Sequence, residues 1–304
     1  MKTPIVHPKH VRFLVNSRRT QTIRGIRLQP VKQHAKGVVS PHLAQQKFRL
    51  ARYLPEGRMQ EVLDHYWIVE WNLKDQPPYT QKTLPYPCVN LVFDLDKTAV
   101  FGVVTGAFDY TLHGTGKVLG LRFKPGGFYG LLGAPVRSIT DKTVSLQAAL
   151  GLDGNQAELA VLTCNDDQSM VDAATALLLP LLPPVDQQLI QIQKWLALLQ
   201  TNTDMQRVEQ FAEHIGVNIR TLQQMFVDYI GVSQKWILRR YRLHDLAFFL
   251  AEGTQPDLAQ LAVDLGYFDQ AHLSNDFKKL IGCTPASYQA QEKLNRAIFQ
   301  HALT

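Results

Sequence analysis

Polar side chains that can hydrogen-bond to the edges of bases gather in two short segments near the C-terminus. Arginine can make two parallel hydrogen bonds to guanine O6 and N7, and glutamine or asparagine can do the same to adenine N6 and N7. In both segments these side chains lie opposite an apolar stripe of helical spacing. The candidate base-reading residues are Arg220, Thr221, Gln223 and Gln224 in the first segment and Gln270, Ala271, Ser274 and Asn275 in the second.

The two segments belong to an internal repeat that fills most of the last hundred residues. Gly216 matches Gly266 at an offset of fifty residues, and Phe226 matches Phe277 at fifty-one, after one extra residue in the second copy. Each copy reads as a helix, a turn at the glycine and a second helix, which is the helix-turn-helix arrangement. The second helix of such a unit enters the DNA major groove. Two units in one chain predict contacts with two successive major grooves without a dimer.

Local signals place the second helix of each unit. Asn218 and Asp269 are the expected N-caps, because their side chains can accept a hydrogen bond from the first helical turn. Leu222 and Phe226 belong to the apolar stripe that we expect in the core of the first unit. His272 lies between the two faces of its helix, where we expect it to pack or to cap rather than to read a base.

Positive charge is unevenly distributed along the chain. The net charge is +6, yet residues 1–45 hold nine Lys or Arg and no Asp or Glu, so the remainder is slightly acidic. Basic side chains nevertheless cluster beside both reading segments, which favours phosphate contacts over a merely solvated surface. The candidate phosphate contacts are Lys235, Arg239, Arg240, Lys278 and Lys279.

These motifs resemble the AraC/XylS class of bacterial transcription regulators. The resemblance rests on LQQMFVDYIGVSQKWILRRYRL at Leu222–Leu243 and GYFDQAHLSNDFKKLIGCTP at Gly266–Pro285, and it extends over about residues 186–290. It implies two helix-turn-helix subdomains joined by one long helix, about Ser233–Glu252, that dock on successive major-groove faces of double-stranded promoter DNA.

The chain departs from this class at two positions. Members usually have arginine where this chain has Gln224 and commonly where it has Asn275. The loss of both charges implies a different operator, or weaker intrinsic binding that is offset elsewhere. The acid-free extension at 1–33 is the candidate for that offset.

The N-terminal half carries the signals of short β-strands. His65–Leu73 alternates between two faces, with Trp67, Val69 and Trp71 on one of them. Short strands separated by glycine-rich turns, with no helices between them, predict a small antiparallel sandwich or barrel. The further strands are expected at Val89–Leu95, Thr98–Thr105, Tyr110–His113 and Lys117–Phe123.

The N-terminal half is also similar to a sensor-like domain that accompanies this DNA-binding region, through HYWIVEWNL at His65–Leu73 and GKVLGLRFKPGGFYGLLG at Gly116–Gly133. The resemblance implies a β-rich, cupin-like regulatory module and names no ligand. A pocket there would use Arg122 to hold an anionic group, with aromatic side chains around it. The alternative is that the aromatic side chains form core and that Arg122 is structural. The candidate pocket residues are Trp67, Trp71, Phe93, Phe123 and Arg122.

The expected fold is α+β in four parts. A basic extension at 1–33 precedes a β-rich regulatory domain with flanking helices at 34–180. A proline-rich linker at 181–185 leads to an all-α DNA-binding domain at 186–304.

The sequence offers few motifs that would indicate another class of function. The chain has no HExxH, GxSxG, phosphate-loop or dinucleotide-binding motif, so we expect neither catalysis nor a cofactor. His65 and His113 are the only candidates for a metal-binding sensor in the strands, and we expect no metal site. Three scattered cysteines fit reduced thiols. The sequence has no apolar run long enough to cross a membrane and no signal-peptide pattern.

We therefore expect a bacterial transcriptional activator that works in the cytoplasm, associates with the nucleoid when bound to DNA, and acts with RNA polymerase. Its N-terminal domain is expected to sense an unknown small-molecule effector, to mediate homodimerisation, or both. One alternative is a constitutive DNA-binding protein whose N-terminal domain serves only oligomerisation. Another is a metal-binding cupin-like sensor or enzyme fused to a DNA-binding domain.

Overall fold

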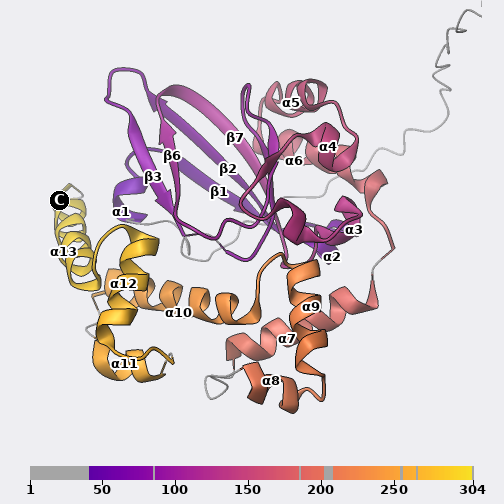
Figure 1. Ribbon diagram of the computed structural model, residues 1–304. Coiled ribbons are helices and arrows are strands. Elements are labelled where there is room, and N and C mark those ends of the chain that lie inside the picture. The colour runs from indigo at the N-terminus through magenta and orange to yellow at the C-terminus, as the bar shows by residue number, and fades with distance from the viewer. Residues whose placement is uncertain are drawn as a thin grey trace, which may run out of the picture.

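The computed structural model describes residues 41–84, 86–184, 186–201, 208–253, 256–264 and 266–302. Its N-terminal part is built on β-sheet and its C-terminal part on helices, which confirms the expected α+β class (Figure 1). The basic extension at 1–33 lies outside the described residues.

A six-stranded antiparallel sheet forms the centre of the N-terminal part. A two-stranded antiparallel sheet, which we call the β3–β6 ribbon, lies over one face of the large sheet (Figure 1). The strands of the large sheet, in spatial order, are β1 (Arg49–Tyr53), β2 (Leu63–Leu73), β7 (Gly114–Phe123), β4 (Asn90–Phe93), β5 (Ala99–Phe101) and β8 (Thr143–Val144). The ribbon consists of β3 (Tyr79–Thr83) and β6 (Phe108–Leu112).

The sequence pattern finds β2 and β4 to β7, and it misses the edge strands β1 and β8 and one half of the ribbon. Residues 89–95 and 98–105, expected as strands, contain the shorter β4 and β5, and 117–123 lies inside the longer β7. Tyr79–Thr83 reads YTQKT and lacks alternating apolar positions, so the pattern does not predict β3. The ribbon matters for function because it closes one side of a cavity.

Strand β2 shows how the large sheet separates a core face from a cavity face. Ile68 is fully buried against the helices, whereas Trp67 and Trp71 point to the ribbon side. A Cβ atom at Gly120 would lie 2.0 Å from the Trp67 ring, and one at Gly116 would lie 2.1 Å from the Trp71 ring. The two indole rings therefore lie across β7 at positions where only glycine leaves room for them.

Helices cover the core face of the sheet. Ile68 and Leu119 pack in one buried cluster with Met170 and Ala174 of α6. The remaining elements of the N-terminal part are α1 (Pro41–Ala44), α2 (Met59–Val62), α3 (Tyr129–Leu132), η1 (Val136–Ile139), α4 (Leu146–Leu150), α5 (Gly154–Leu162), α6 (Asp167–Leu178) and η2 (Leu179–Leu181).

The C-terminal part contains the two helix-turn-helix units. The first is α8–α9 and the second is α11–α12, with α10 running between them (Figure 1). Gly216 ends the supporting helix of the first unit with φ of +67°, a left-handed conformation that favours glycine, and Gly266 has φ of +68° in the second unit. The helices are α7 (Gln187–Thr201), α8 (Val208–His214), α9 (Ile219–Tyr229), α10 (Gln234–Ala251), α11 (Leu258–Asp264), α12 (Gln270–Ile281) and α13 (Pro285–Ala302).

The hydrophobic core does not divide at the proline-rich segment between α6 and α7. Phe211 and Phe226 of the first unit belong to the same buried cluster as the sheet residues. Phe277 and Tyr288 belong to a second cluster, which includes Leu84 of the N-terminal part. The first helix-turn-helix unit is thus continuous with the N-terminal core, while the second has a core of its own.

Candidate nucleic-acid interface and ligand cavity

Helix α9 presents a polar face to solvent. Asn218 caps the helix as expected, because its Oδ1 accepts a hydrogen bond from the backbone N–H of Arg220 at 2.9 Å. On the other side of the helix Leu222 and Phe226 are completely buried. Gln224 Nε2 donates a hydrogen bond to Asp228 Oδ2 at 2.7 Å, so its amide is already held. The exposed side chains of this face are Arg220, Thr221, Gln223 and Gln224.

Helix α12 repeats this arrangement. Asp269 caps it, with Oδ1 accepting from the backbone N–H of His272 at 2.7 Å. Leu273 and Phe277 are completely buried, and the His272 ring meets the edge of Tyr267 at a centroid distance of 5.2 Å. Of the four candidate readers on this helix, Gln270, Ala271 and Asn275 are exposed, whereas Ser274 is half-buried.

Most of the candidate phosphate contacts are accessible. Lys235, Lys278 and Lys279 are exposed. Arg239 is half-buried and lies 3.8 Å from a carboxylate oxygen of Asp276, so an acidic neighbour already offsets part of its charge.

Arg240 is a correction to the sequence-based expectation. It is only 5% exposed, and its guanidinium donates a hydrogen bond to the backbone carbonyl of Thr105 in the N-terminal part. Its guanidinium also lies over the Trp236 ring, 4.6 Å from the centroid. Burial lowers the pKa of Arg240 to about 10. The side chain holds α10 to the β5–β6 loop and does not face the solvent from which a phosphate would approach.

A cavity of about 240 Å³ lies between the ribbon and the large sheet. Trp67, Trp71 and Arg122 line it, as the sequence analysis proposed for a pocket. Phe93 and Phe123 do not, because alternation along β4 and β7 turns both rings into the core on the opposite face.

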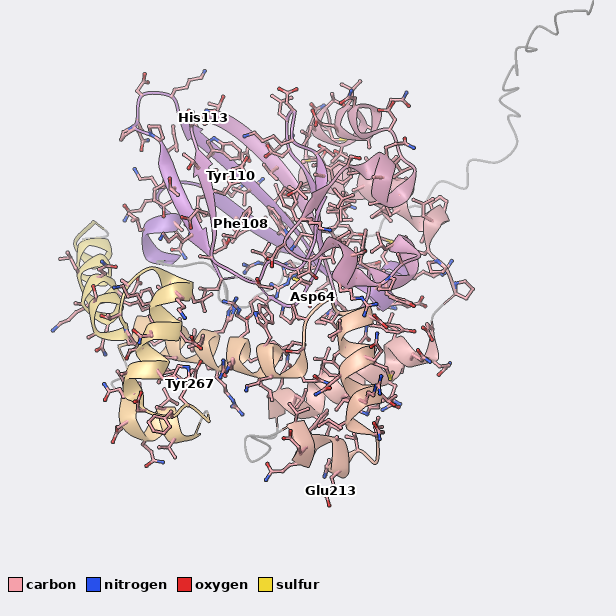
Figure 2. All side chains as sticks on the ribbon, viewed as in Figure 1. Asp64, Phe108, Tyr110, His113, Glu213 and Tyr267 are labelled. Atoms are coloured by element: carbon pink, nitrogen blue, oxygen red, sulfur yellow. The ribbon has the colours of Figure 1, made fainter. Side chains whose placement is uncertain are left out.

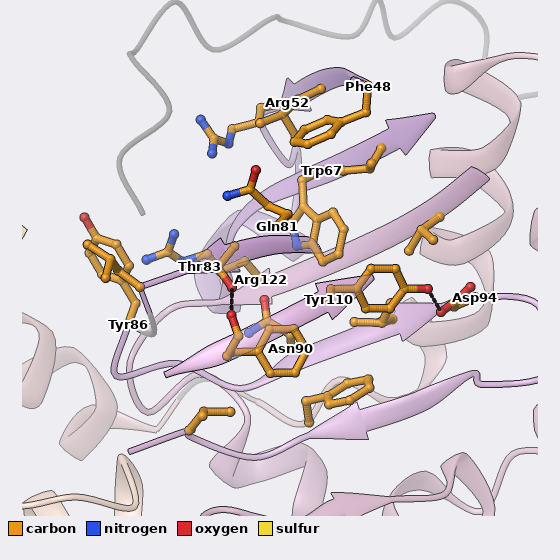
Figure 3. A pocket seen from close by; sticks show the side chains of 18 of the residues that line it. Phe48, Arg52, Trp67, Gln81, Thr83, Tyr86, Asn90, Asp94, Tyr110 and Arg122 are labelled. Atoms are coloured by element: carbon orange, nitrogen blue, oxygen red, sulfur yellow. Dashed lines mark hydrogen bonds between the residues drawn. The ribbon is translucent and has the colours of Figure 1, made fainter. Parts of the chain in front are cut away.

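One end of this cavity is cationic. Arg52 of β1 and Arg122 of β7 both line it, and Figure 3 shows their guanidinium groups on the same side of Trp67. Arg122 stacks on the Tyr86 ring at 3.8 Å from the centroid, and its Nε lies 3.6 Å from Asp64 Oδ2. Burial and the neighbouring Arg122 charge lower the pKa of Arg52.

The other end carries a carboxylate that is already hydrogen-bonded. Tyr110 donates its hydroxyl proton to Asp94 Oδ2 at 2.5 Å, and Asp94 is only 7% exposed. Burial and this carboxylate raise the pKa of the Tyr110 phenol. In the view of Figure 2, Asp64 lies toward the side of the N-terminal part that faces the C-terminal helices, whereas Tyr110 and His113 lie farther from them.

The part of the chain that the structure describes contains neither a metal-binding cluster nor a membrane-spanning helix. No group of three or more His, Cys, Asp or Glu side chains there is arranged to hold a metal ion. His65 instead lies 3.1 Å from Asp64 through its Nδ1, and His113 contributes its carbonyl to the Trp71 indole N–H. Among the described helices, none has the length and apolarity needed to span a bilayer.

Two family models match the chain. Residues 51–145 match a domain of unknown function, DUF6597, and residues 211–291 match a helix-turn-helix domain. The second match covers α9 and α12 together with α10, which joins them. The C-terminal region thus contains a helix-turn-helix domain, in a segment that resembles the AraC/XylS class.

Curated relatives of this chain are named as regulators. An uncharacterized HTH-type transcriptional regulator of Haemophilus influenzae is 30% identical over 99 residues, which are 33% of this chain and 33% of that protein. The putative HTH-type transcriptional regulator YkgA of Escherichia coli K12 is 29% identical over 85 residues, 28% of this chain and 35% of that protein. The chain thus spans about a third of the length of these relatives.

Solved structures with AraC-type domains give distant matches. ToxT of Vibrio cholerae is 12% identical, with 80% of this chain and 98% of that chain covered at a TM-score of 0.34. The C-terminal domain of AraT, a response regulator from Geobacillus stearothermophilus, is 23% identical, with 36% of this chain and 88% of that chain covered at a TM-score of 0.30. Scores of this size do not establish a shared arrangement of the whole chain.

At the cationic end of the cavity, sequence reasoning missed Arg52 and Tyr86. Arg52 has no motif around it, and Tyr86 stands in the Pro-Tyr-Pro stretch that reads as a strand break. The signal that identifies Arg52 is its register opposite Trp67, which requires the pairing of β1 with β2.

Proposed function

We propose that this protein is a transcriptional regulator that binds double-stranded promoter DNA through α9 and α12. The observation that carries the proposal is the same on both helices: a capped helix buries its apolar stripe and exposes amide and guanidinium side chains that suit base edges. The proposed base readers are Arg220, Thr221, Gln223, Gln224, Gln270, Ala271, Ser274 and Asn275.

The phosphate contacts that we propose are Lys235, Arg239, Lys278 and Lys279. These side chains would fix the position of the protein on the duplex without reading its sequence. Arg240 is left out, because its guanidinium is engaged with the N-terminal part.

The proposed role is activation together with RNA polymerase in the bacterial cytoplasm, at the nucleoid, with no catalytic step. The N-terminal domain would sense a small molecule in the cavity beneath the ribbon, and it can also serve dimerisation. Its Arg122–Tyr86 stack supports sensing, because Tyr86 also meets His244 of α10 at a centroid distance of 4.2 Å. The cavity is therefore in contact with α10, the helix between the two helices that we propose to read DNA.

The experiment is a selection of bound duplexes from a random DNA library with the full chain. We expect an enriched consensus, and we expect Gln223→Ala with Gln270→Ala to abolish the enrichment. Lys74→Ala is the matched control, because Lys74 is exposed in the turn after β2 and should not affect the consensus. A selection that enriches no consensus, or the same consensus selected by the double variant, would contradict the proposal.

A further inference from the structure

The size of the cavity limits what it can hold. An apolar cavity of about 150 Å³ binds benzene in another protein. The cavity beneath the ribbon measures about 240 Å³, so it has room for one ring with a short chain, or for a medium alkyl chain. The lining is predominantly apolar, so a nucleotide or a sugar phosphate is too polar for this space.

The walls of the cavity favour a ligand with an apolar body. Trp67 and Trp71 form its floor, and Phe101 and Phe108 meet edge to face with ring centroids 6.1 Å apart on the opposite side. Leu112 and Val118 also line the space. Aromatic and aliphatic surfaces of this kind gain free energy by covering apolar ligand area.

The cationic end lacks a full set of partners. The Nε atom of Arg52 is buried and has no hydrogen-bond partner within the described part of the chain. Arg122 has only the Asp64 carboxylate as an ionic partner there, at 3.6 Å, and that carboxylate also lies 3.1 Å from His65 Nδ1. The Arg52 Nε–H is thus a buried donor without an acceptor in the described part of the chain, which costs free energy. An anion between the two guanidinium groups would accept from this donor and place a second negative charge beside Arg122.

The opposite end does not favour a cation. The Asp94 carboxylate accepts a hydrogen bond from the Tyr110 hydroxyl at 2.5 Å. The backbone carbonyl of Asp94 accepts a hydrogen bond from Thr98 Oγ1 at 3.1 Å. A cationic ligand would have to compete with the Tyr110 hydroxyl for this carboxylate and would place its apolar body toward the two arginines.

We propose that the cavity binds a small carboxylate with an apolar body, an arylalkanoate or a medium-chain alkanoate, whose anionic group lies between Arg52 and Arg122. Charge-assisted hydrogen bonds from guanidinium to carboxylate are stronger than neutral ones and can be bidentate. The inference deepens the proposed function, on which it rests, by naming the chemical class of the effector.

The cationic end of the cavity is connected to α10, the helix between the two proposed reading helices. Tyr86 lies between the Arg122 guanidinium and α10, where it contacts His244 at 4.2 Å and Tyr241 at 6.5 Å between ring centroids. A carboxylate that draws Arg122 into the cavity would alter the Tyr86 stack and, through it, the contact with α10. It can favour the altered contact only by the difference between its affinities for the altered and the unaltered contact.

The experiment is calorimetric titration of the full chain with two series of probes. Within each series the apolar body is kept and the charge of the polar end group is changed. The probes are 4-phenylbutyrate and octanoate, their neutral amides, and 4-phenylbutylamine as the cation. We expect one saturable site for at least one carboxylate, at least tenfold tighter than its amide, with the amine weakest. Equal affinities across the charge series, or no saturable binding by either carboxylate at millimolar concentration, would overturn the inference.

A variant locates the anionic group. Arg52→Gln should weaken the carboxylate at least tenfold and leave the amide unchanged, whereas Lys74→Gln, which removes an exposed charge of the same domain, should change neither. An Arg52→Gln protein that still melts cooperatively and binds the carboxylate as before would contradict the proposed position. The charge series on the unaltered chain needs no variant, so it decides the ligand class even where Arg52→Gln unfolds.

DNA binding is measured separately from ligand binding. A chain that binds its selected DNA but no carboxylate would refute this inference and leave the proposed function intact. A chain that binds a carboxylate but enriches no DNA consensus would refute the proposed DNA binding and leave the carboxylate site intact.

Discussion

Arg220 is the one arginine among the proposed base-reading residues, and it stands at the start of α9. Asn218 fixes the first turn of that helix through the backbone N–H of Arg220, while the guanidinium remains exposed. Helix-turn-helix units contact base edges with the N-terminal residues of the second helix. The position and the side chain are therefore those expected of a residue that binds guanine, which is the role that we propose for Arg220.

The first prediction is that Arg220→Ala weakens binding to the selected site by about 1–3 kcal/mol and relaxes the preference at one base pair. Fluorescence anisotropy on the selected duplex and on four single-base variants measures both effects. An equal loss on selected and random DNA would instead make Arg220 a phosphate contact.

The second prediction concerns the neighbouring Gln224, where AraC/XylS members usually have arginine. Gln224→Arg should tighten DNA binding, and each added phosphate contact should steepen the dependence of log K on log salt by about 0.9. Asp228, which now accepts from Gln224 at 2.7 Å, would offset part of the new charge. Titration across a salt series checks this, and an unchanged affinity and slope would show that position 224 does not face DNA.

At the scale of elements, α9 and α12 could be read from the sequence because their signals are local. A cap, an apolar stripe and a polar face all lie within about a dozen residues, and the structure has all three. Phe93 and Arg240 were assigned wrongly because their surroundings depend on contacts far along the chain. Alternation sets the face that Phe93 takes, but which face borders the cavity depends on where the β3–β6 ribbon lies, and Arg240 is buried by a loop 135 residues earlier.

The third prediction is that the two helix-turn-helix units respond separately to loss of core. Phe226→Ala and Phe277→Ala each remove a completely buried ring, which costs about 3–5 kcal/mol through lost burial and the cavity left behind. Because the rings belong to different clusters, Phe226→Ala should also loosen the N-terminal sheet, and Phe277→Ala should not.

Hydrogen exchange under mild urea measures this difference in each unit. The sheet amides should exchange faster in Phe226→Ala and remain protected in Phe277→Ala. Unaltered melting by both variants would be incompatible with the helix register used for both reading faces.

At the scale of the whole molecule, the N-terminal part holds the first helix-turn-helix unit directly. Thr140 Oγ1 donates to the carbonyl of Gly231 at 2.9 Å, and the Tyr129 and Tyr229 rings stack with centroids 3.9 Å apart. Together with the Arg240 contact, these interactions join the N-terminal part to α9 and α10. The arrangement suits the proposed function, because a change in the N-terminal part can be passed to these helices by direct contact.

The fourth prediction concerns the basic extension at 1–33, which lies outside the described residues and holds eight Lys or Arg. If these charges contact phosphates, a chain that begins at His34 should bind DNA more weakly at low salt, with a shallower salt slope and the same consensus. Affinity measured across a salt series for the full and shortened chains tests this. Identical slopes would assign the extension no electrostatic role on DNA.

The most direct test of the account is hydroxyl-radical footprinting of the full chain on its selected duplex. Two helix-turn-helix units joined by α10 should protect two patches on one side of the DNA, about one helical turn of 10–10.5 base pairs apart. Gln223→Ala should weaken the patch read by α9, and Gln270→Ala should weaken the patch read by α12. A single protected patch, or the loss of both patches together in each variant, would contradict the claim that two helices of one chain read successive grooves.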